Sequence, residues 1–118
     1  MAHGHFRARA WKTPRTVWMG DYHGVQESDD GYREILGFID TVTLKLILTA
    51  GKNRTAQFTT QVVLNKIVLE NGVPLRIHTD AAREFVGKAM QALCKMMLIA
   101  KTDTMAHNPQ GNALIERV

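Results

Sequence analysis

The chain has 118 residues, of which 45% are hydrophobic and 22% are charged, and its formal net charge at pH 7 is +4. This composition indicates one globular domain with a core, and no apolar run reaches the roughly 18 residues that a membrane span needs. The single cysteine excludes an intrachain disulfide and a cysteine-pair zinc site.

The positive charge is concentrated at the N-terminus. Eleven basic and eleven acidic side chains balance over the rest of the chain, whereas the first twenty residues contain no acid. We therefore predict a basic, flexible arm over residues 1–15 and a folded domain over residues 16–118. The arm is either a solvated extension or a segment that lies on nucleic-acid phosphates. Its basic residues are Arg7, Arg9, Lys12 and Arg15.

The first strand-like segment contains an unusual acid. Residues 16–24 are rich in strand formers, and their alternation places Met19, Asp21 and His23 on one face. On a buried strand Asp21 would need a partner or a metal ion, because desolvating a lone charge is costly. The alternative is an edge strand with Asp21 in water.

Two more strands, residues 33–40 and 42–49, are expected to form a hairpin. Asp40 lies at the end of the first of them. An aspartate at such a position favours turns because it accepts hydrogen bonds from nearby backbone N–H groups. We therefore predict a structural role for Asp40.

A helix over residues 55–70 follows, with Asn53 as its expected cap and the sequence Asn71-Gly72-Val73-Pro74 as its stop signal. Residues 75–79 form a short apolar strand that leads into Asp80.

The second expected helix covers residues 83–97, where apolar residues recur at helical spacing. Its methionines and Cys94 are predicted to fill the core. Residues 97–100 form the last strand, and a turn-rich loop over residues 106–112 precedes the start of a helix near Glu116.

This order of elements predicts an α/β fold. Three antiparallel strands followed by alternating helix and strand favour a mixed five-stranded sheet flanked by helices. Active groups in such sheets gather where the strand order switches. Asp21 on the first strand, Asp80 at the C-terminal end of the fourth and Glu116 at the start of the last helix are therefore candidate site residues.

Several motifs occur together in a fixed order, and thirty-five residues separate Asp80 from Glu116. With this set the chain resembles the catalytic core of retroviral and LTR-retrotransposon integrases over roughly residues 16–118. The resemblance implies a ribonuclease H-like fold that is incomplete at its C-terminal helices. The motifs are Trp18-Met19-Gly20-Asp21-Tyr22-His23-Gly24, Phe38-Ile39-Asp40-Thr41, the segment 72–80 ending Arg76-Ile77-His78-Thr79-Asp80, Glu84-Phe85, Leu93-Cys94, and the segment 107–117 beginning His107-Asn108-Pro109-Gln110-Gly111.

The resemblance also implies a function. Asp21, Asp80 and Glu116 match the family's acidic triad, which binds two Mg²⁺ or Mn²⁺ ions, and the loop that touches DNA ends matches His107, Asn108, Gln110 and Asn112. Enzymes of this family trim the 3′ ends of a linear element DNA and then attack target DNA with the exposed 3′ hydroxyl. The implied partners are therefore element and target DNA, with a homo-oligomer in the full-length protein and no membrane. The implied location is the nucleus if the chain comes from a eukaryotic retroelement, and otherwise intracellular.

The chemistry of the three acids agrees with this resemblance. Carboxylate oxygens are hard ligands that favour Mg²⁺ or Mn²⁺, and two metals can serve the attacking and leaving oxygens of a phosphodiester. We expect Asp80 to bridge the two ions.

The sequence departs from the family pattern at two positions, because Ala82 and Ala113 stand where the family usually has glycine. Alanine avoids positive φ, so we expect a differently shaped loop. Two other functions compete with the integrase. One is a truncated, catalytically inactive element remnant that binds nucleic acid through its basic arm. The other is a host ribonuclease H-like nuclease, which the Asn-Pro-Gln sequence and the thirty-five-residue gap disfavour.

Overall fold

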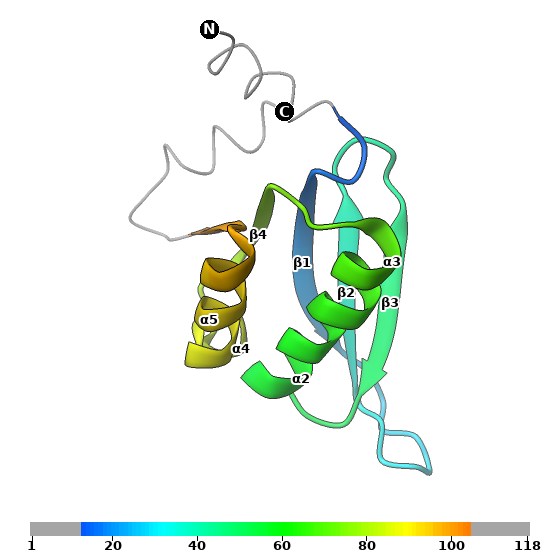
Figure 1. Cartoon of the computed structure of the whole chain (residues 1–118). Helices are drawn as coiled ribbons and strands as arrows, with labels where there is room; N and C mark the ends of the chain where they lie inside the picture. The colour runs from blue at the N-terminus through cyan, green and yellow to red at the C-terminus, as the bar shows by residue number, and fades with distance from the viewer. Residues whose placement is uncertain (1–12, 105–118) are drawn as a thin grey trace, which may run out of the picture.

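The computed structural model describes residues 13–104, which form a mixed five-stranded sheet with helices on one face (Figure 1). Among these residues no helix has the length and the apolar character to cross a bilayer. The strands are β1 (Val17–Gly24), β2 (Glu34–Asp40), β3 (Leu46–Gly51), β4 (Arg76–Asp80) and β5 (Ala100–Thr104). The helices are α2 (Ala56–Val62), the π-helix η1 (Val63–Val68), α3 (Leu69–Asn71), α4 (Arg83–Val86) and α5 (Lys88–Met97).

The strand order in the sheet is β3-β2-β1-β4-β5, so β1 is central. The strand β1 pairs antiparallel with β2 and parallel with β4, and β4 pairs parallel with β5. The first three strands are joined by turns, whereas the return to β4 crosses over through the helical segment α2 to α3. This topology confirms the mixed sheet that the order of elements predicted.

One face of the sheet and the helices above it form the core. Trp18, Leu36, Phe38 and Ile77 point from β1, β2 and β4 into this core, and none of them is exposed. Full burial of such a side chain contributes about 1.5–3 kcal/mol each. The opposite face is called the open face below, because no described helix covers it (Figure 1). Its apolar residues Leu46 and Leu48 stay more than half exposed.

The first predicted helix is present, but its start and its interior differ from the prediction. Thr55 is the cap, and its hydroxyl accepts a hydrogen bond from the Phe58 amide at 3.1 Å. Asn53 instead binds Arg33. Residues 63–68 form a π-helix, whose wider turn brings Val68 over Val63, so that both are buried.

The second predicted helix is broken at Gly87. This residue has an extended conformation between α4 and α5, with φ −67° and ψ 170°. A Cβ there would lie 3.0 Å from the Ala56 Cβ and 3.0 Å from the Arg83 carbonyl. Glycine therefore lets the chain pass close to the start of α2. As predicted, Cys94 is buried in the core from α5.

Two predicted strands are displaced in the structure. Residues 42–45 form the turn after β2, and β3 begins at Leu46 and ends at Gly51. The last strand begins at Ala100 and ends at Thr104, because Leu98 adopts a left-handed conformation with φ 59° and ends α5 there. The strand β4 also includes Asp80 itself.

Asp40 has the structural role that its position predicted. Its side chain is fully buried and accepts hydrogen bonds from the Arg15 amide at 3.0 Å and from the Val42 amide at 3.1 Å. A third comes from the Thr43 hydroxyl at 2.7 Å. The carboxylate thereby fixes both the turn after β2 and the backbone that enters β1.

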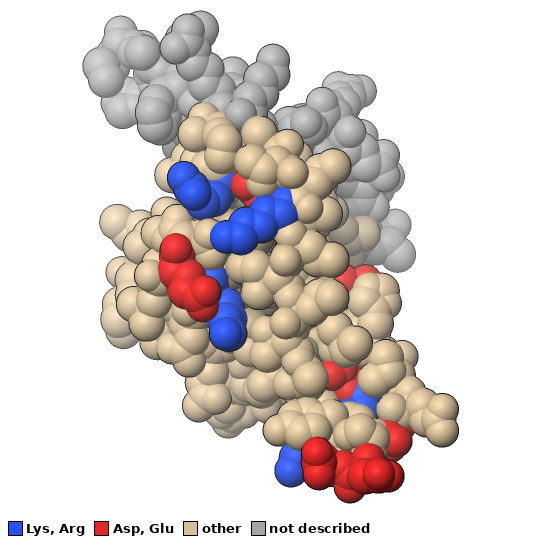
Figure 2. All heavy atoms as spheres, turned by 90° about the vertical axis from the view of Figure 1, so that its right-hand side faces the viewer, with Lys and Arg blue, Asp and Glu red and all other residues tan. Residues whose placement is uncertain are grey.

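Charges on the side of the molecule nearest β3 are mixed (Figure 2). Three exposed acids, Glu27, Asp29 and Asp30, belong to the loop between β1 and β2, where Arg33 lies 3.7 Å from Glu27. In Figure 2 acidic side chains gather at the lower end of this side, with basic side chains next to them and further up. The described residues therefore form no continuous basic surface on this side.

Candidate active site on the open face

Asp21 lies on the central strand of the sheet, with its side chain on the open face. The alternative of an edge strand is wrong, although Asp21 lies in water as that alternative expected, and the expectation that a strand inside the sheet would bury this carboxylate is wrong as well. Asp21 stays exposed to solvent, with 62% of its side chain accessible. Opposite Asp21 on β2 stands Gly37, which has no side chain to cover the carboxylate.

Asp80 lies at the C-terminal end of β4, the parallel neighbour of β1. The pairing of Met19 with His78 sets the register, and Asp21 and Asp80 each follow two residues later. Residues two apart on a strand share a face, so both carboxylates are on the open face. The alignment depends on strand pairing and not on a flexible loop.

The backbone after Asp80 is unstrained. The Asp80 Oδ1 accepts a hydrogen bond from the Ala82 amide at 3.0 Å. Ala82 has φ −63° and ψ 148°, a conformation open to any residue. Ala82 thus avoids positive φ, as expected for alanine. Ala113 lies outside the described residues.

Both carboxylates line one groove of about 630 Å³ on the open face. One wall is apolar and comes from β1, β2 and β3. The other end is polar and includes His23, whose Nε2 lies 3.6 Å from the Asp21 Oδ2. The groove therefore has a polar end that contains both acids and an apolar end that contains neither. The apolar wall consists of Met19, Ile39, Leu46 and Leu48, and the polar end of Asp21, His23, His78, Thr79, Asp80 and Thr104.

His78 is a groove residue to which the sequence analysis assigned no role. Its ring nitrogens are both hydrogen-bonded to hydroxyls of β5, Nδ1 to Thr102 and Nε2 to Thr104, each at 2.8 Å. Burial, together with the charges of Lys101 and Arg76, lowers the pKa of His78. The ring thus ties β4 to β5 beside Asp80. Alternation gave a signal for it, because His78 precedes Asp80 by two residues and must share its face.

Most of the other predicted site residues lie outside the described part of the chain. Arg15 is described, and it lies before the start of β1, where its amide binds Asp40. The structure therefore does not bring Arg15 to the groove. The residues outside the described ranges are Glu116, His107, Asn108, Gln110, Asn112, Arg7, Arg9 and Lys12.

The carboxylates of Asp21 and Asp80 suit a hard divalent cation. Both are exposed oxygen donors in one groove, which is the ligand chemistry that Mg²⁺ or Mn²⁺ prefers. Between residues 13 and 104 no group of three or more His, Cys, Asp or Glu side chains is arranged to hold a metal ion. The predicted triad assigns a third ligand to Glu116, which lies outside the described residues.

The chain is similar to retroviral polyproteins. It is 30% identical over 105 residues to the Pol polyprotein of Radiation murine leukemia virus (strain Kaplan), which covers 89% of this chain and 18% of the relative. It is 26% identical over 105 residues to the Gag-Pol polyprotein of Avian reticuloendotheliosis virus, covering 89% of this chain and 9% of that protein. The chain thus spans less than a fifth of these relatives. No family model matches it.

Solved structures show the same fold. The HTLV-2 integrase catalytic core domain in complex with magnesium, in its trimeric form, matches with a TM-score of 0.66 and 26% identity over 88% of this chain and 68% of that chain. The simian T-cell lymphotropic virus intasome, in complex with a PP2A regulatory subunit, matches with a TM-score of 0.73 and 22% identity. This second match covers 90% of this chain and 37% of the other.

Proposed function

Because the chain is a homologue of retroviral Pol polyproteins and has the fold of the retroviral integrase catalytic core, we propose that it joins retroelement DNA to target DNA. The proposed reactions are metal-dependent trimming of the 3′ ends of the element and transfer of those ends into target DNA. One observation carries the proposal: Asp21 and Asp80 lie on adjacent parallel strands and line one groove.

Parallel pairing suits phosphoryl transfer, because it holds two carboxylates on one face of the sheet without the aid of a loop. Two carboxylates in one groove favour a bound divalent cation. Asp80 is the last residue of β4 and its carboxylate accepts a hydrogen bond from the Ala82 amide, and we propose it as the ligand that two ions would share. Glu116 is proposed as the third ligand.

The proposed metal is Mg²⁺ or Mn²⁺, with two ions in each site. Support comes from the donor set of the groove and from the HTLV-2 core domain, which is a magnesium complex. Two bound ions supply charge stabilisation to the attacking and leaving oxygens of a phosphodiester. The protein side chains hold the ions and orient the DNA, and the reaction needs no covalent intermediate with the protein.

The proposed substrates are the ends of the element DNA and a target DNA. We assign contact with the DNA ends to the loop residues His107, Asn108, Gln110 and Asn112, and non-specific phosphate contact to the basic arm. We also propose a homo-oligomer. The HTLV-2 core domain occurs in dimeric and trimeric forms, which supports this assignment.

A strand-transfer assay tests the proposed reaction. A labelled donor oligonucleotide, a target DNA and Mn²⁺ are incubated with this chain and with a C-terminally extended version of it. We expect Asp80→Asn to lower the transfer rate of the active version by at least about a hundredfold, because the substitution removes a charged ligand of the ions. Asp30→Asn, an exposed loop variant outside the groove, is the matched control and should leave the rate unchanged.

Two outcomes contradict the proposal. One is full activity of Asp80→Asn, which would remove the groove from the reaction. The other is an extended protein that binds DNA but transfers no ends, which would identify the chain as the DNA-binding remnant of an element.

A further inference from the structure

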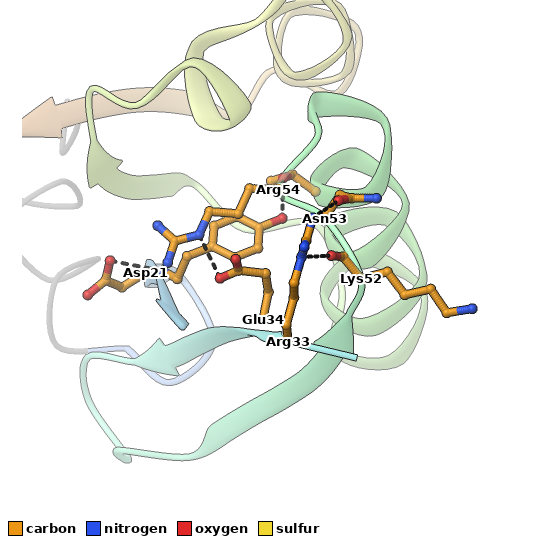
Figure 3. A network of polar contacts seen from close by, with 8 residues as sticks. Asp21, Arg33, Glu34, Lys52, Asn53 and Arg54 are labelled. Carbon is orange, nitrogen blue, oxygen red and sulfur yellow. Dashed lines mark hydrogen bonds and ion pairs between the residues drawn. The ribbon is translucent and has the colours of Figure 1, made fainter. Parts of the chain in front are cut away.

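Arg54 is held rigidly in the link between β3 and α2 (Figure 3). Its Nε donates a hydrogen bond to the Glu34 Oε1 at 2.7 Å, and its guanidinium lies over the Tyr22 ring, 5.4 Å from the ring centre. An ion pair on one edge and an aromatic ring beneath restrict both the position and the plane of the guanidinium. The side chain nevertheless remains 40% exposed.

The groups that hold Arg54 are themselves fixed. The Tyr22 hydroxyl is hydrogen-bonded to the Thr59 hydroxyl at 2.7 Å, and the Thr59 hydroxyl donates to the Thr55 carbonyl at 2.7 Å. This chain of bonds ties β1 to the first turn of α2. The Tyr22 ring beneath Arg54 is therefore fixed by buried hydrogen bonds, whereas the ion pair of Arg54 with Glu34 lies at the surface.

Arg54 lies outside the lining of the groove, on the side of Asp21. In Figure 3 the two terminal nitrogens of Arg54 lie on the side of Asp21, away from the bond to Glu34. Gly24 of β1 lies beside this edge of the guanidinium, since a Cβ there would be in van der Waals contact with the Arg54 Nη2 at 3.7 Å. The hydrogen bond to Glu34 and the charges of Glu84 and Asp21 also raise the pKa of Arg54.

We propose that Arg54 binds a backbone phosphate of the DNA strand that enters the groove, beside the phosphodiester held at Asp21 and Asp80. This inference depends on the function proposed above. A guanidinium presents a planar pair of N–H groups that matches two phosphate oxygens. With one edge fixed by Glu34, the other edge is already oriented, so little side-chain entropy is lost when a phosphate binds.

Arg33 provides an internal comparison, because it also contacts the link between β3 and α2 but lies beside the loop between β1 and β2. Its Nε donates to the Lys52 carbonyl at 3.0 Å and its Nη2 to the Asn53 side chain at 2.8 Å. Its Nη1 lies 3.7 Å from the Glu27 carboxylate. All three nitrogens thus have protein partners, and the side chain sits beside the acidic loop. Arg33 is a purely structural arginine by these contacts.

DNA binding by the full chain is the first test. Fluorescence anisotropy of a short fluorescein-labelled duplex, measured over a range of salt concentrations, compares Arg54→Gln with Arg33→Gln. Arg54→Gln is expected to weaken binding by about ten- to a hundredfold, the value of a hydrogen bond to a charged group. It should also lower the slope of log affinity against log salt by about one. Arg33→Gln should change neither quantity.

Arg54→Lys separates binding from structure. This variant keeps the charge and loses the planar fork, so it should restore the salt slope while recovering only part of the affinity. Thermal melting of each variant reports folding. Equal affinities for Arg54→Gln and Arg33→Gln would overturn the proposal, as would an affinity loss in Arg54→Gln that only tracks a lower melting temperature.

The strand-transfer assay distinguishes this inference from the proposed function. In the active, extended protein Arg54→Gln is expected to raise the KM for donor DNA more than it lowers kcat. If Asp80→Asn abolishes transfer and Arg54→Gln leaves the KM unchanged, the phosphate contact is refuted and the function stands. If Asp80→Asn has no effect on strand transfer, the proposed function itself is refuted, whatever Arg54→Gln does.

Discussion

Replacing Asp40 with alanine is expected to lower the stability of the protein strongly, although Asp40 lies outside the groove. Its fully buried carboxylate accepts three hydrogen bonds, from two backbone amides and the Thr43 hydroxyl. Each such bond to a charged group contributes about 1.5–3 kcal/mol. Because neighbouring bonds are not additive and water can enter the vacated space, the expected loss is about 3–5 kcal/mol. Domains are typically stable by only about 5–15 kcal/mol.

Urea unfolding followed by circular dichroism measures this loss. Asp21→Ala and Asp80→Ala are the matched controls, since each removes an exposed carboxylate that accepts one bond from a nearby amide. Their stabilities should stay within about 1 kcal/mol of the unsubstituted chain. An Asp40→Ala midpoint equal to that of Asp21→Ala would refute the structural role. If the role is correct, any activity lost in an Asp40 variant reports unfolding and not a missing ligand.

Two further predictions concern His78 and the arm. Burial lowers the pKa of His78 below its ordinary value of 6.5. The imidazole of His78 therefore binds a proton more tightly in the unfolded chain than in the folded one. Its contribution to stability is complete above about pH 6.5 and is lost as the pH falls through the lowered folded pKa. Urea midpoints in EDTA should therefore drop more on acidification for the unsubstituted chain than for His78→Gln, and parallel curves would count against this. Replacing Arg7, Arg9 and Lys12 with glutamine, which leaves the Arg15 bond to Asp40 intact, should weaken DNA binding at low salt and flatten its salt dependence. Unchanged anisotropy titrations would remove the arm from the DNA interface.

The order and type of the elements could be predicted because they depend on local patterns. Alternating strand formers, helical spacing and the Gly72-Pro74 stop signal each act within a few residues. Where the prediction failed, a distant contact decided the outcome. The second helix is broken at Gly87, where a Cβ would lie only 3.0 Å from the Ala56 side chain at the start of α2. Thr55 and not Asn53 caps α2, because the Asn53 side chain is bound to Arg33 across the β2–β3 hairpin.

In the candidate site, too, some features follow from local patterns and others from distant contacts. Alternation along β1 placed Asp21 with Met19 and His23. It did not show which face of the sheet the helices cover, because apolar residues occur on both faces. The partners of His78 are 24 and 26 residues away, and Arg54 meets Glu34 across 20 residues. No local pattern specifies such pairs.

The sequence by itself determined the mixed sheet, the place of Asp80 at the end of a strand and the structural role of Asp40, because strand period, chain order and turn chemistry are local properties. Only the tertiary structure decided that Asp21 is central yet exposed and that it shares a groove with Asp80. Those facts depend on strand register and on which face the helices cover. Both are set by long-range packing of the core around Trp18 and Phe38, which buries one face and leaves the acids on the other.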